Sequence, residues 1–158
     1  MNNCFILLAG GESKRFNSKI PKPYTFYKGK PLLLHSLDKI KVFNKFSKII
    51  LVVNKKHKKY IKNLDIKNIK IVVGGNTRAE SSFNALKSIK SSNCKNILIH
   101  DAARPNFSLK LLEKLMNELK NNDCVIPAIQ TADSIKQKTS NIITNLKRKD
   151  IYLIQTPQ

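Results

Sequence analysis

Short apolar runs alternate along the chain with segments of helical periodicity. The runs are rich in β-branched residues and apolar at consecutive positions, as in strands that are buried on both faces. They cover residues 5–8, 49–53, 69–73, 97–99 and 124–129. We therefore expect each of these runs to form a strand of one buried sheet.

The segments between the runs predict helices at residues 31–43, 77–89 and 108–119, and a short basic helix near 56–63. In the second helix the side chains expected to face inward are Ala79, Phe83, Leu86 and Ile89. The βαβα alternation predicts an α/β fold with a mainly parallel sheet and helices on both faces. Ligands of such sheets bind at the carboxyl ends of the strands, near the point where the strand order reverses.

The segment from Gln130 to Lys149 has a different character, because it is polar with only weak period-two alternation. We interpret residues 130–149 as an extended hairpin or arm that leaves the domain. A short strand is expected at 151–154, before the chain ends in Gln-Thr-Pro-Gln. The 158 residues are enough for one domain with a core and too few for two of ordinary size.

The charge of the chain limits its possible partners. The sequence contains 30 Lys and Arg residues and only 10 Asp and Glu, which gives a net charge of +20. The lysines are scattered without interleaved aromatic residues, so we expect a solvated surface that attracts small anions and no specific nucleic-acid site. In a chain so biased towards lysine, the few arginines are informative. They are Arg15, Arg78, Arg104 and Arg148.

Membrane association and secretion are not expected. The longest apolar runs are far shorter than the roughly 20 residues that span a bilayer, and no signal-peptide cleavage pattern follows the first run. The three cysteines, Cys4, Cys94 and Cys124, have no CxxC spacing and lie in apolar runs. We therefore expect reduced core cysteines and a cytoplasmic protein.

The first motif follows the first predicted strand, where Gly10 and Gly11 precede Arg15 and Lys22. Glycines at this place let backbone N–H groups approach phosphate oxygens. Arg15 could clamp phosphates through two hydrogen bonds, and Lys22 offers a compact charge. The motif matches neither the GxxxxGK[ST] nor the GxGxxG pattern, and a tight strand-to-helix turn with surface cations remains an alternative.

Two further motifs each follow a predicted strand. Residues 74–82 combine a glycine pair with polar residues that open a helix, which suits a base or a phosphate; a helix cap with an exposed arginine is the alternative. Residues 100–105, His-Asp-Ala-Ala-Arg-Pro, place Asp101 where a carboxylate could hold Mg²⁺. The alternative there is an Asp101–Arg104 ion pair, and we expect His100 to pack rather than to catalyse.

Taken in order, the glycine loop, the His-Asp-Ala-Ala-Arg-Pro block and the final Gln-Thr-Pro-Gln block resemble the 2-C-methyl-D-erythritol 4-phosphate cytidylyltransferases of non-mevalonate isoprenoid biosynthesis. The resemblance runs from about Cys4 to Gln158. It implies a Rossmann-like nucleotidyltransferase domain, a homodimer formed through the arm, and Mg²⁺ as cofactor. The implied reaction joins CTP and methylerythritol phosphate to give CDP-methylerythritol and pyrophosphate.

The resemblance also implies roles for individual residues. Arg15 and Lys22 match the catalytic cations that stabilise the transition state, and Asp101 matches the metal region. The matches to nucleotide contacts are Ala9, Gly10, Gly11, Gly75, Asn76, Arg78, Ser81 and Ala102. The matches to contacts with methylerythritol phosphate are Ser134, Arg148 and Thr156, of which Arg148 would reach the partner subunit's site.

Some features depart from the family pattern. Ser13 stands where the family usually has glycine and Pro23 where it usually has glutamine; Asn76 and Ser134 replace the more usual aspartate and threonine. Family members also continue past the last block, with a second carboxylate and a second lysine, so the resemblance implies a domain without its C-terminal part. A cytidylyltransferase for another polyol phosphate, such as ribitol 5-phosphate, and a non-catalytic nucleotide-binding fragment remain alternatives.

Overall fold

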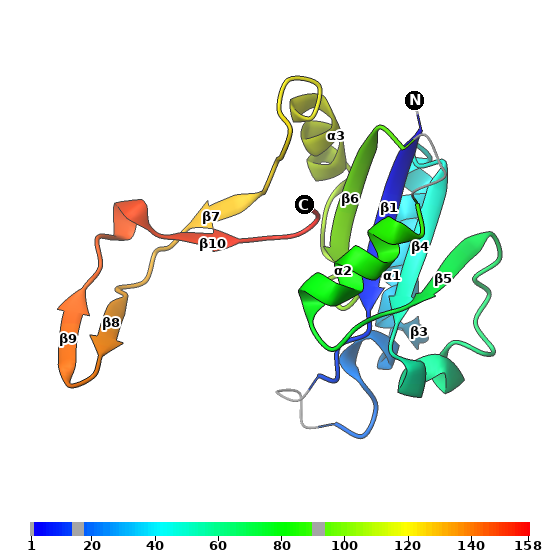
Figure 1. The fold of residues 1–158 in the computed structure, drawn as a ribbon, viewed down its shortest axis with the longest axis horizontal. Coiled ribbons are helices and arrows are strands. Elements are labelled where there is room, and N and C mark those ends of the chain that lie inside the picture. The colour runs from blue at the N-terminus through cyan, green and yellow to red at the C-terminus, as the bar shows by residue number, and fades with distance from the viewer. Residues whose placement is uncertain (1, 14–17, 90–93) are drawn as a thin grey trace.

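A four-stranded parallel sheet forms the centre of the computed structural model, which describes residues 2–13, 18–89 and 94–158 (Figure 1). The strand order is β5-β4-β1-β6, with β1 at Asn3–Ala9, β4 at Lys48–Val53, β5 at Ile69–Val73 and β6 at Asn96–Asp101. The chain runs from β1 out to β5 and then returns to the other side of β1. The strand order therefore reverses between β1 and β6, where ligands of such folds bind.

Helices cover both faces of the sheet, as predicted. They are α1 at Leu32–Phe43, α2 at Arg78–Lys87 and α3 at Leu109–Glu118. Thr77 and Ser108 cap α2 and α3, since each hydroxyl accepts a hydrogen bond from a backbone N–H of the first turn. The basic segment forms a 3₁₀ helix, Lys55–Tyr60, in place of the longer helix expected near 56–63.

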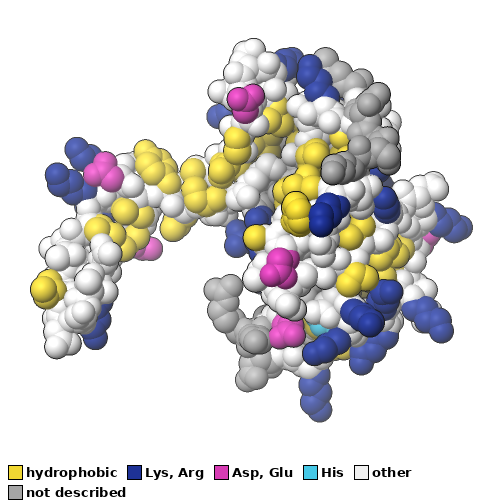
Figure 2. Space-filling model, viewed as in Figure 1, with side chains coloured by type: hydrophobic (Ala, Val, Ile, Leu, Met, Phe, Trp, Pro, Cys, Tyr) yellow, Lys and Arg dark blue, Asp and Glu magenta, His cyan; other side chains and the backbone are white. Residues whose placement is uncertain are grey.

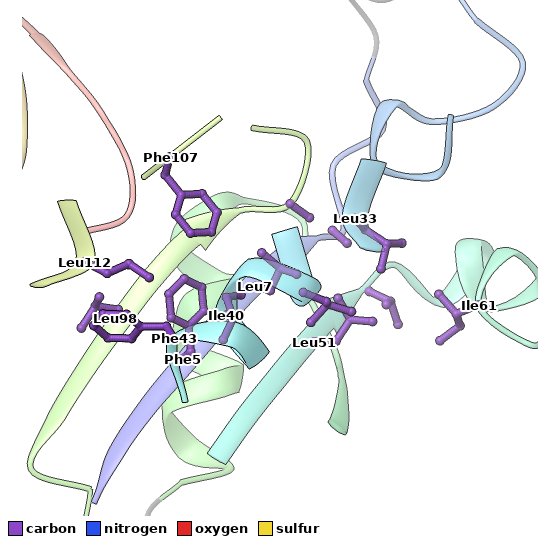
Figure 3. Packing of buried hydrophobic residues seen from close by; sticks show 14 of the residues in the cluster. Phe5, Leu7, Leu33, Ile40, Phe43, Leu51, Ile61, Leu98, Phe107 and Leu112 are labelled. Carbon is purple, nitrogen blue, oxygen red and sulfur yellow. The ribbon is translucent and has the colours of Figure 1, made fainter. Parts of the chain in front are cut away.

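Two hydrophobic clusters lie on opposite faces of the sheet, because successive side chains of a strand point to opposite sides. The larger cluster packs α1 and α3 against the sheet and includes Phe5, Leu7, Leu33, Leu37, Ile40, Leu51, Leu98 and Leu112 (Figure 3). The smaller cluster, beneath α2, consists of Cys4, Ile6, Ile50, Val52, Ala85 and Ile89. Most of the hydrophobic core therefore lies on one face of the sheet, beneath α1 and α3.

The predicted inward face of α2 is wrong for Ala79, Phe83 and Leu86, which are exposed, and right for Ile89, which is buried just past the helix. Phe83 and Leu86 are 55% and 37% exposed, whereas Ser81 and Ala85 face the sheet. The helix turns its small side chains inward because it lies close to the loop after β5. A Cβ added to Gly74 would lie only 2.7 Å from the Ser81 hydroxyl.

Two other expectations are also corrected. Of the apolar run 124–129, only its end forms a strand, β7 at Ala128–Gln130, which pairs antiparallel with β10 at Tyr152–Ile154 outside the main sheet. Pro127 precedes β7, and a proline cannot donate a ladder hydrogen bond in the middle of a sheet. Cys124 on this run is consequently exposed, not buried.

The other two cysteines are not reduced, because Cys4 and Cys94 are paired as a disulfide, with Cα atoms 6.0 Å apart. The backbone before β6 brings Cys94 alongside the start of β1, within the Cα separation that a disulfide allows. The expectation of reduced cysteines is therefore not met at Cys4 and Cys94.

A β-hairpin does form within the segment 130–149. It consists of β8 at Lys136–Thr139 and β9 at Ile142–Asn145, and it projects from the domain (Figure 1). A smaller hairpin joins β2 at Phe26–Tyr27 to β3 at Lys30–Pro31. Every residue of β7, β8, β9 and β10 is exposed, so the arm has no core of its own. Among the described residues, no helix is both long and apolar enough to cross a membrane.

Candidate functional site

Loops from several strands meet at the carboxyl edge of the sheet, around Gly10. A Cβ at Gly10 would lie 3.5 Å from the backbone nitrogen of Asn54, which follows β4, and 4.0 Å from the hydroxyl of Ser81 on α2. The Gly74 amide, after β5, donates to the carbonyl of Val53 at 2.9 Å. The loops that follow β1, β4 and β5 are thus in contact, and the predicted residues Gly10 and Ser81 lie together.

The turn that carries Lys22 is attached to the same edge. The Tyr24 hydroxyl donates to the carbonyl of Ala9, the last residue of β1, at 2.9 Å. The Lys22 amide donates to the Ser13 hydroxyl, also at 2.9 Å. Lys22 itself is exposed. Arg15, the other predicted catalytic cation, lies outside the described residues.

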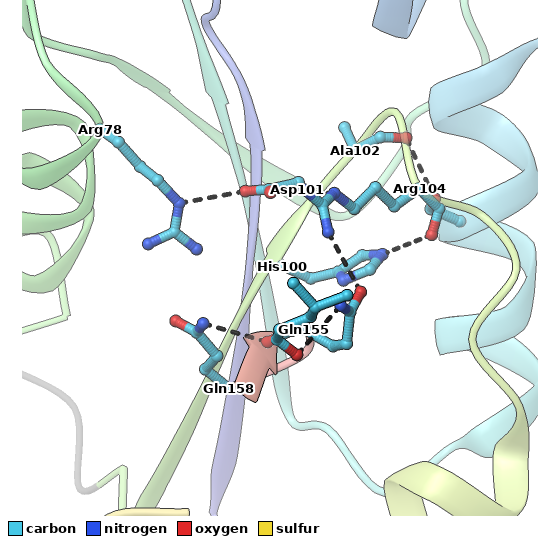
Figure 4. A network of polar contacts seen from close by, with 9 residues as sticks. Arg78, His100, Asp101, Ala102, Arg104, Gln155 and Gln158 are labelled. Atoms are coloured by element: carbon cyan, nitrogen blue, oxygen red, sulfur yellow. Dashed lines mark hydrogen bonds and ion pairs between the residues drawn. The ribbon is translucent and has the colours of Figure 1, made fainter. Parts of the chain in front are cut away.

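The segment after β5 forms a helix cap of the kind considered as the alternative. The Glu80 carboxylate accepts a hydrogen bond from the Asn76 amide at 2.7 Å, and Thr77 accepts one from the Glu80 amide at 3.0 Å. A Cβ at Gly75 would overlap the Cβ of Glu80, so only glycine fits there. The cap leaves Arg78, the first residue of α2, directed towards β6 (Figure 4).

Asp101 is held by two arginines. The Arg78 Nε donates to one carboxylate oxygen at 3.1 Å, and the Arg104 Nε lies 3.4 Å from the other (Figure 4). Asp101 pairs in register with Leu8, and the Ala102 amide donates to the Leu8 carbonyl at 2.9 Å. Asp101 therefore lies beside the end of β1, next to the glycine loop. The Asp101–Arg104 pair is present, and Arg78 adds a partner that sequence spacing did not predict.

The described residues contain no group of three or more His, Cys, Asp or Glu side chains able to hold a metal ion. Asp101 is a single carboxylate whose side chain is 30% exposed. That is compatible with Mg²⁺, which proteins often hold by one or two carboxylates together with substrate phosphates. A cation at Asp101 would compete with Arg78 and Arg104 for the same two oxygens.

α1 braces the loop that follows Asp101. The Ser36 hydroxyl donates to the Ala102 carbonyl at 3.2 Å, while the Lys39 ammonium donates to the carbonyls of Pro105 and Phe107 at 2.7 and 2.9 Å. Sequence reasoning missed both residues, because each lies 66 or more positions from its partner. The one available signal was that Ser36 and Lys39 are polar residues on an otherwise apolar face of α1.

His100 packs in the core, as expected. It is fully buried, its ring lies edge-on to Phe107 with the centroids 4.6 Å apart, and its Nε2 bonds the Arg104 carbonyl at 2.9 Å. Burial lowers the pKa of His100 to about 4, because the charged imidazolium would lose its water. The ring is therefore neutral at pH 7, and its Nε2–H donates to that carbonyl.

This lowered pKa predicts acid sensitivity. Between pH 6.5 and about 4 the unfolded chain binds a proton at His100 that the folded chain does not, so the free energy of unfolding falls as the pH falls. The stability that comes from keeping His100 neutral is fully present above pH 6.5. About 3 kcal/mol of the free energy of unfolding is lost by pH 4. Urea unfolding of wild type and His100→Gln at pH 7, 5.5 and 4.5 measures it. We expect a smaller pH dependence in the variant, and equal slopes would contradict this.

The Gln-Thr-Pro-Gln end of the chain lies along β6. Gln158 and Ile99 exchange two backbone hydrogen bonds, of 2.7 and 2.9 Å, and the Arg104 guanidinium donates to the Gln155 side chain at 3.4 Å (Figure 4). The Thr156 hydroxyl is buried without a hydrogen-bond partner. Two blocks that are some 50 residues apart in sequence are thus neighbours in the fold.

Ser134 and Arg148 are not brought to the glycine loop of this chain. Both are exposed on the arm, where Arg148 donates to the Ala132 carbonyl at 3.2 Å. The arm projects away from the sheet (Figure 1). Two surface hollows contain none of the predicted residues: one is lined by residues 62–67, and one, near the amino ends of β4 and β5, includes Lys41, Ile49 and Ile69.

Known proteins resemble this chain in both sequence and fold. A sequence model of the family IspD, 2-C-methyl-D-erythritol 4-phosphate cytidylyltransferase, matches residues 3–158. A bifunctional enzyme IspD/IspF of Pelagibacter ubique is 78% identical over all of this chain, which spans 43% of that protein. The 2-C-methyl-D-erythritol 4-phosphate cytidylyltransferase of Caldicellulosiruptor bescii is 35% identical over all of this chain and 72% of its own length.

Solved structures give the same result. The bifunctional IspDF of Campylobacter jejuni aligns with a TM-score of 0.82 and 34% identity, over 99% of this chain and 40% of that one. The 2-C-methyl-D-erythritol 4-phosphate cytidylyltransferase (IspD) of Francisella tularensis aligns with a TM-score of 0.79 and 29% identity, over 99% of this chain and 71% of that one. Sequence and structure together show that this chain belongs to the 2-C-methyl-D-erythritol 4-phosphate cytidylyltransferase family.

Proposed function

We propose that this chain provides the nucleotide-binding part of a cytidylyltransferase that joins CTP and 2-C-methyl-D-erythritol 4-phosphate, giving CDP-methylerythritol and pyrophosphate. One observation carries the proposal: the loops bearing Gly10, Lys22, Arg78 and Asp101 converge on the carboxyl edge of β1 and β6. Family membership over residues 3–158 supports the choice of substrates.

The chemistry follows from the charges of the reactants. A phosphate oxygen of methylerythritol phosphate attacks the α-phosphorus of CTP, a new P–O bond forms, and the bond to the leaving pyrophosphate breaks. The attacking phosphate is already an anion, so no general base on the protein is needed. Lys22 and the backbone N–H groups around Gly10 and Gly11 would offset the growing negative charge, and the protein acts by positioning and electrostatic stabilisation.

Mg²⁺ is the cofactor we propose, held by Asp101 together with oxygens of the nucleotide. The ion would supply positive charge to the phosphates of CTP, beyond what Lys22 provides. Asp101 has hard oxygen donors at the edge where the triphosphate would lie. Arg78, released from Asp101 by the cation, would then be available to the nucleotide.

We further propose a homodimer formed through the arm. Ile142 and Ile143 at its tip are 68% and 62% exposed, and apolar side chains follow the arm towards the domain (Figure 2). Exposed apolar surface of this kind favours a protein partner. Dimerisation would also explain why Ser134 and Arg148 lie on the arm, if they serve the partner subunit's site. Sedimentation should show a dimer that Ile142→Ser with Ile143→Ser converts to a monomer; a monomeric wild type would contradict this.

The surface charge gives no reason to propose a nucleic-acid partner. Lys and Arg side chains are spread around the visible face of the domain (Figure 2). Such a surface attracts anions without selecting a sequence. The cytoplasmic location remains a prediction from the sequence, in which no signal-peptide cleavage pattern follows the first apolar run.

A turnover assay at the protein's full natural length tests the proposal. CTP and Mg²⁺ are supplied with methylerythritol phosphate or ribitol 5-phosphate, and pyrophosphate release is followed. We expect faster release with methylerythritol phosphate. Faster release with ribitol 5-phosphate would assign the other polyol. No release, with tight polynucleotide binding that survives about 0.2 M salt, would leave a binding function only.

A further inference from the structure

Lys22 stands out within a short segment that is otherwise buried. Pro21, Pro23 and Tyr24 are all buried, and Lys22 between them is exposed. The three residues Lys22–Tyr24 form a 3₁₀ helix, closed by hydrogen bonds from Tyr24 to Pro21 and from Thr25 to Lys22. Two prolines fix two backbone φ angles in this stretch. The segment is thus a stiff turn that presents one cation.

A stiff turn places its cation well only if the turn itself is attached to the site. One attachment is Tyr24, whose hydroxyl donates to the carbonyl of Ala9 and whose ring stacks on Tyr60, with the centroids 5.1 Å apart. Burial raises the pKa of the Tyr24 phenol, which keeps the donor proton in place at all ordinary pH values. This contact joins the turn to the end of β1.

The second attachment is Ser13, in the glycine loop itself. Its hydroxyl accepts the backbone N–H of Lys22 at 2.9 Å, across nine positions of sequence. Ser13 has a φ of 54°, in the left-handed region that glycine adopts without strain and serine does not. Serine at position 13 is therefore unfavourable for the backbone conformation, and its hydroxyl accepts the hydrogen bond from Lys22.

We infer that Ser13 and Tyr24 are positioning residues that hold the Lys22 turn against the glycine loop, so that the Lys22 ammonium and the loop N–H groups face the same triphosphate. The inference rests on the proposed function. It assigns to the Ser13 hydroxyl an effect on turnover that is separate from its effect on folding. Small displacements of a charge-stabilising group lower rates strongly, because electrostatic stabilisation depends on fixed geometry.

Ser13→Gly separates these two effects. Glycine relieves the left-handed backbone and removes the hydroxyl, so we expect a melting temperature equal to or above that of wild type. We expect kcat for pyrophosphate release to fall on the order of tenfold, with a smaller change in KM for CTP. The Lys22 amide should also exchange with deuterium faster, because its acceptor is gone. Tyr24→Phe, which keeps the ring and removes the other attachment, should lower kcat in the same way.

Ser18→Gly is the matched control, since the Ser18 hydroxyl also accepts a backbone N–H, that of Ile20, in the same connection. It should leave kcat and the exchange of the Lys22 amide unchanged. Equal kcat in wild type, Ser13→Gly and Tyr24→Phe would overturn the inference and leave the proposed function intact. A wild-type protein that neither binds CTP nor releases pyrophosphate would overturn both.

Discussion

Lys22→Ala should lower the rate of pyrophosphate release by about 10²-fold or more. This is the size of effect seen when one electrostatic stabiliser of a transition state is removed. The change should appear mainly in kcat, because the charge that Lys22 offsets grows as the pentacoordinate phosphorus forms. Stability should change little, since the lysine side chain is exposed.

Lys41→Ala is a suitable control for the loss of one positive charge, because Lys41 is exposed in the last turn of α1 and lines the hollow with Ile49 and Ile69, near the amino ends of β4 and β5. If Lys41→Ala slowed the reaction as much as Lys22→Ala, the effect would be one of overall charge and the assignment of Lys22 would fail. Pyrophosphate release within twofold or so of wild type in Lys22→Ala would likewise contradict a catalytic role.

Asp101→Asn should have opposite effects with and without Mg²⁺. The amide keeps the shape of the side chain and removes its charge, so the affinity for CTP with Mg²⁺ should fall at least about tenfold, as for other losses near a bound metal. Without the cation, affinity should be equal or higher. The variant removes a negative charge beside the triphosphate and frees Arg78 and Arg104 from their ion pairs.

Calorimetric titration with CTP, in Mg²⁺ and in EDTA, measures both effects. Asp123→Asn gives the same charge change at an exposed position and should leave both affinities unchanged. If Asp101→Asn bound CTP with Mg²⁺ as tightly as wild type, Asp101 would be a structural partner of the two arginines and not a metal ligand.

The strands of the sheet could be predicted from sequence because each is a local run of mainly apolar residues. The runs at 49–53 and 69–73 are rich in β-branched residues, and β4 and β5 form there, although β5 is the edge strand and exposes Ile71 and Val73. The run at 124–129 looked similar. There Val125 packs against the larger cluster, whereas Ile126 and Ile129 are exposed, and hydrophobicity alone does not predict where a segment will lie.

The orientation of α2 could not be predicted for a related reason. Counting apolar residues turned Phe83 and Leu86 inward, whereas close approach to the loop after β5 selects the small residues Ser81 and Ala85. Large apolar side chains dominate a sequence pattern even where small ones make the contact. Steric room is a property of the neighbouring element, here Gly74, and is absent from the helix sequence itself.

The candidate site was predicted in its residue types and only partly in its contacts. The Asp101–Arg104 ion pair could be predicted, because the two residues are only three positions apart in one motif. The Arg78–Asp101 pair spans 23 positions and the Ser13–Lys22 bond nine, and neither can be inferred from spacing. One signal was visible beforehand: serine at position 13, where the resembling family usually has glycine.

The unequal size of the two hydrophobic clusters has a consequence for motion. α2 is held to the sheet through the smaller cluster, to which the helix contributes Ala85, while Ile89 joins the cluster just past the end of the helix. Helices with little buried apolar area open locally at low free energy, and their amides exchange with solvent earlier than those of the core. The amides of α2, the helix that begins with Arg78, should therefore exchange with solvent before those of β1 beneath it.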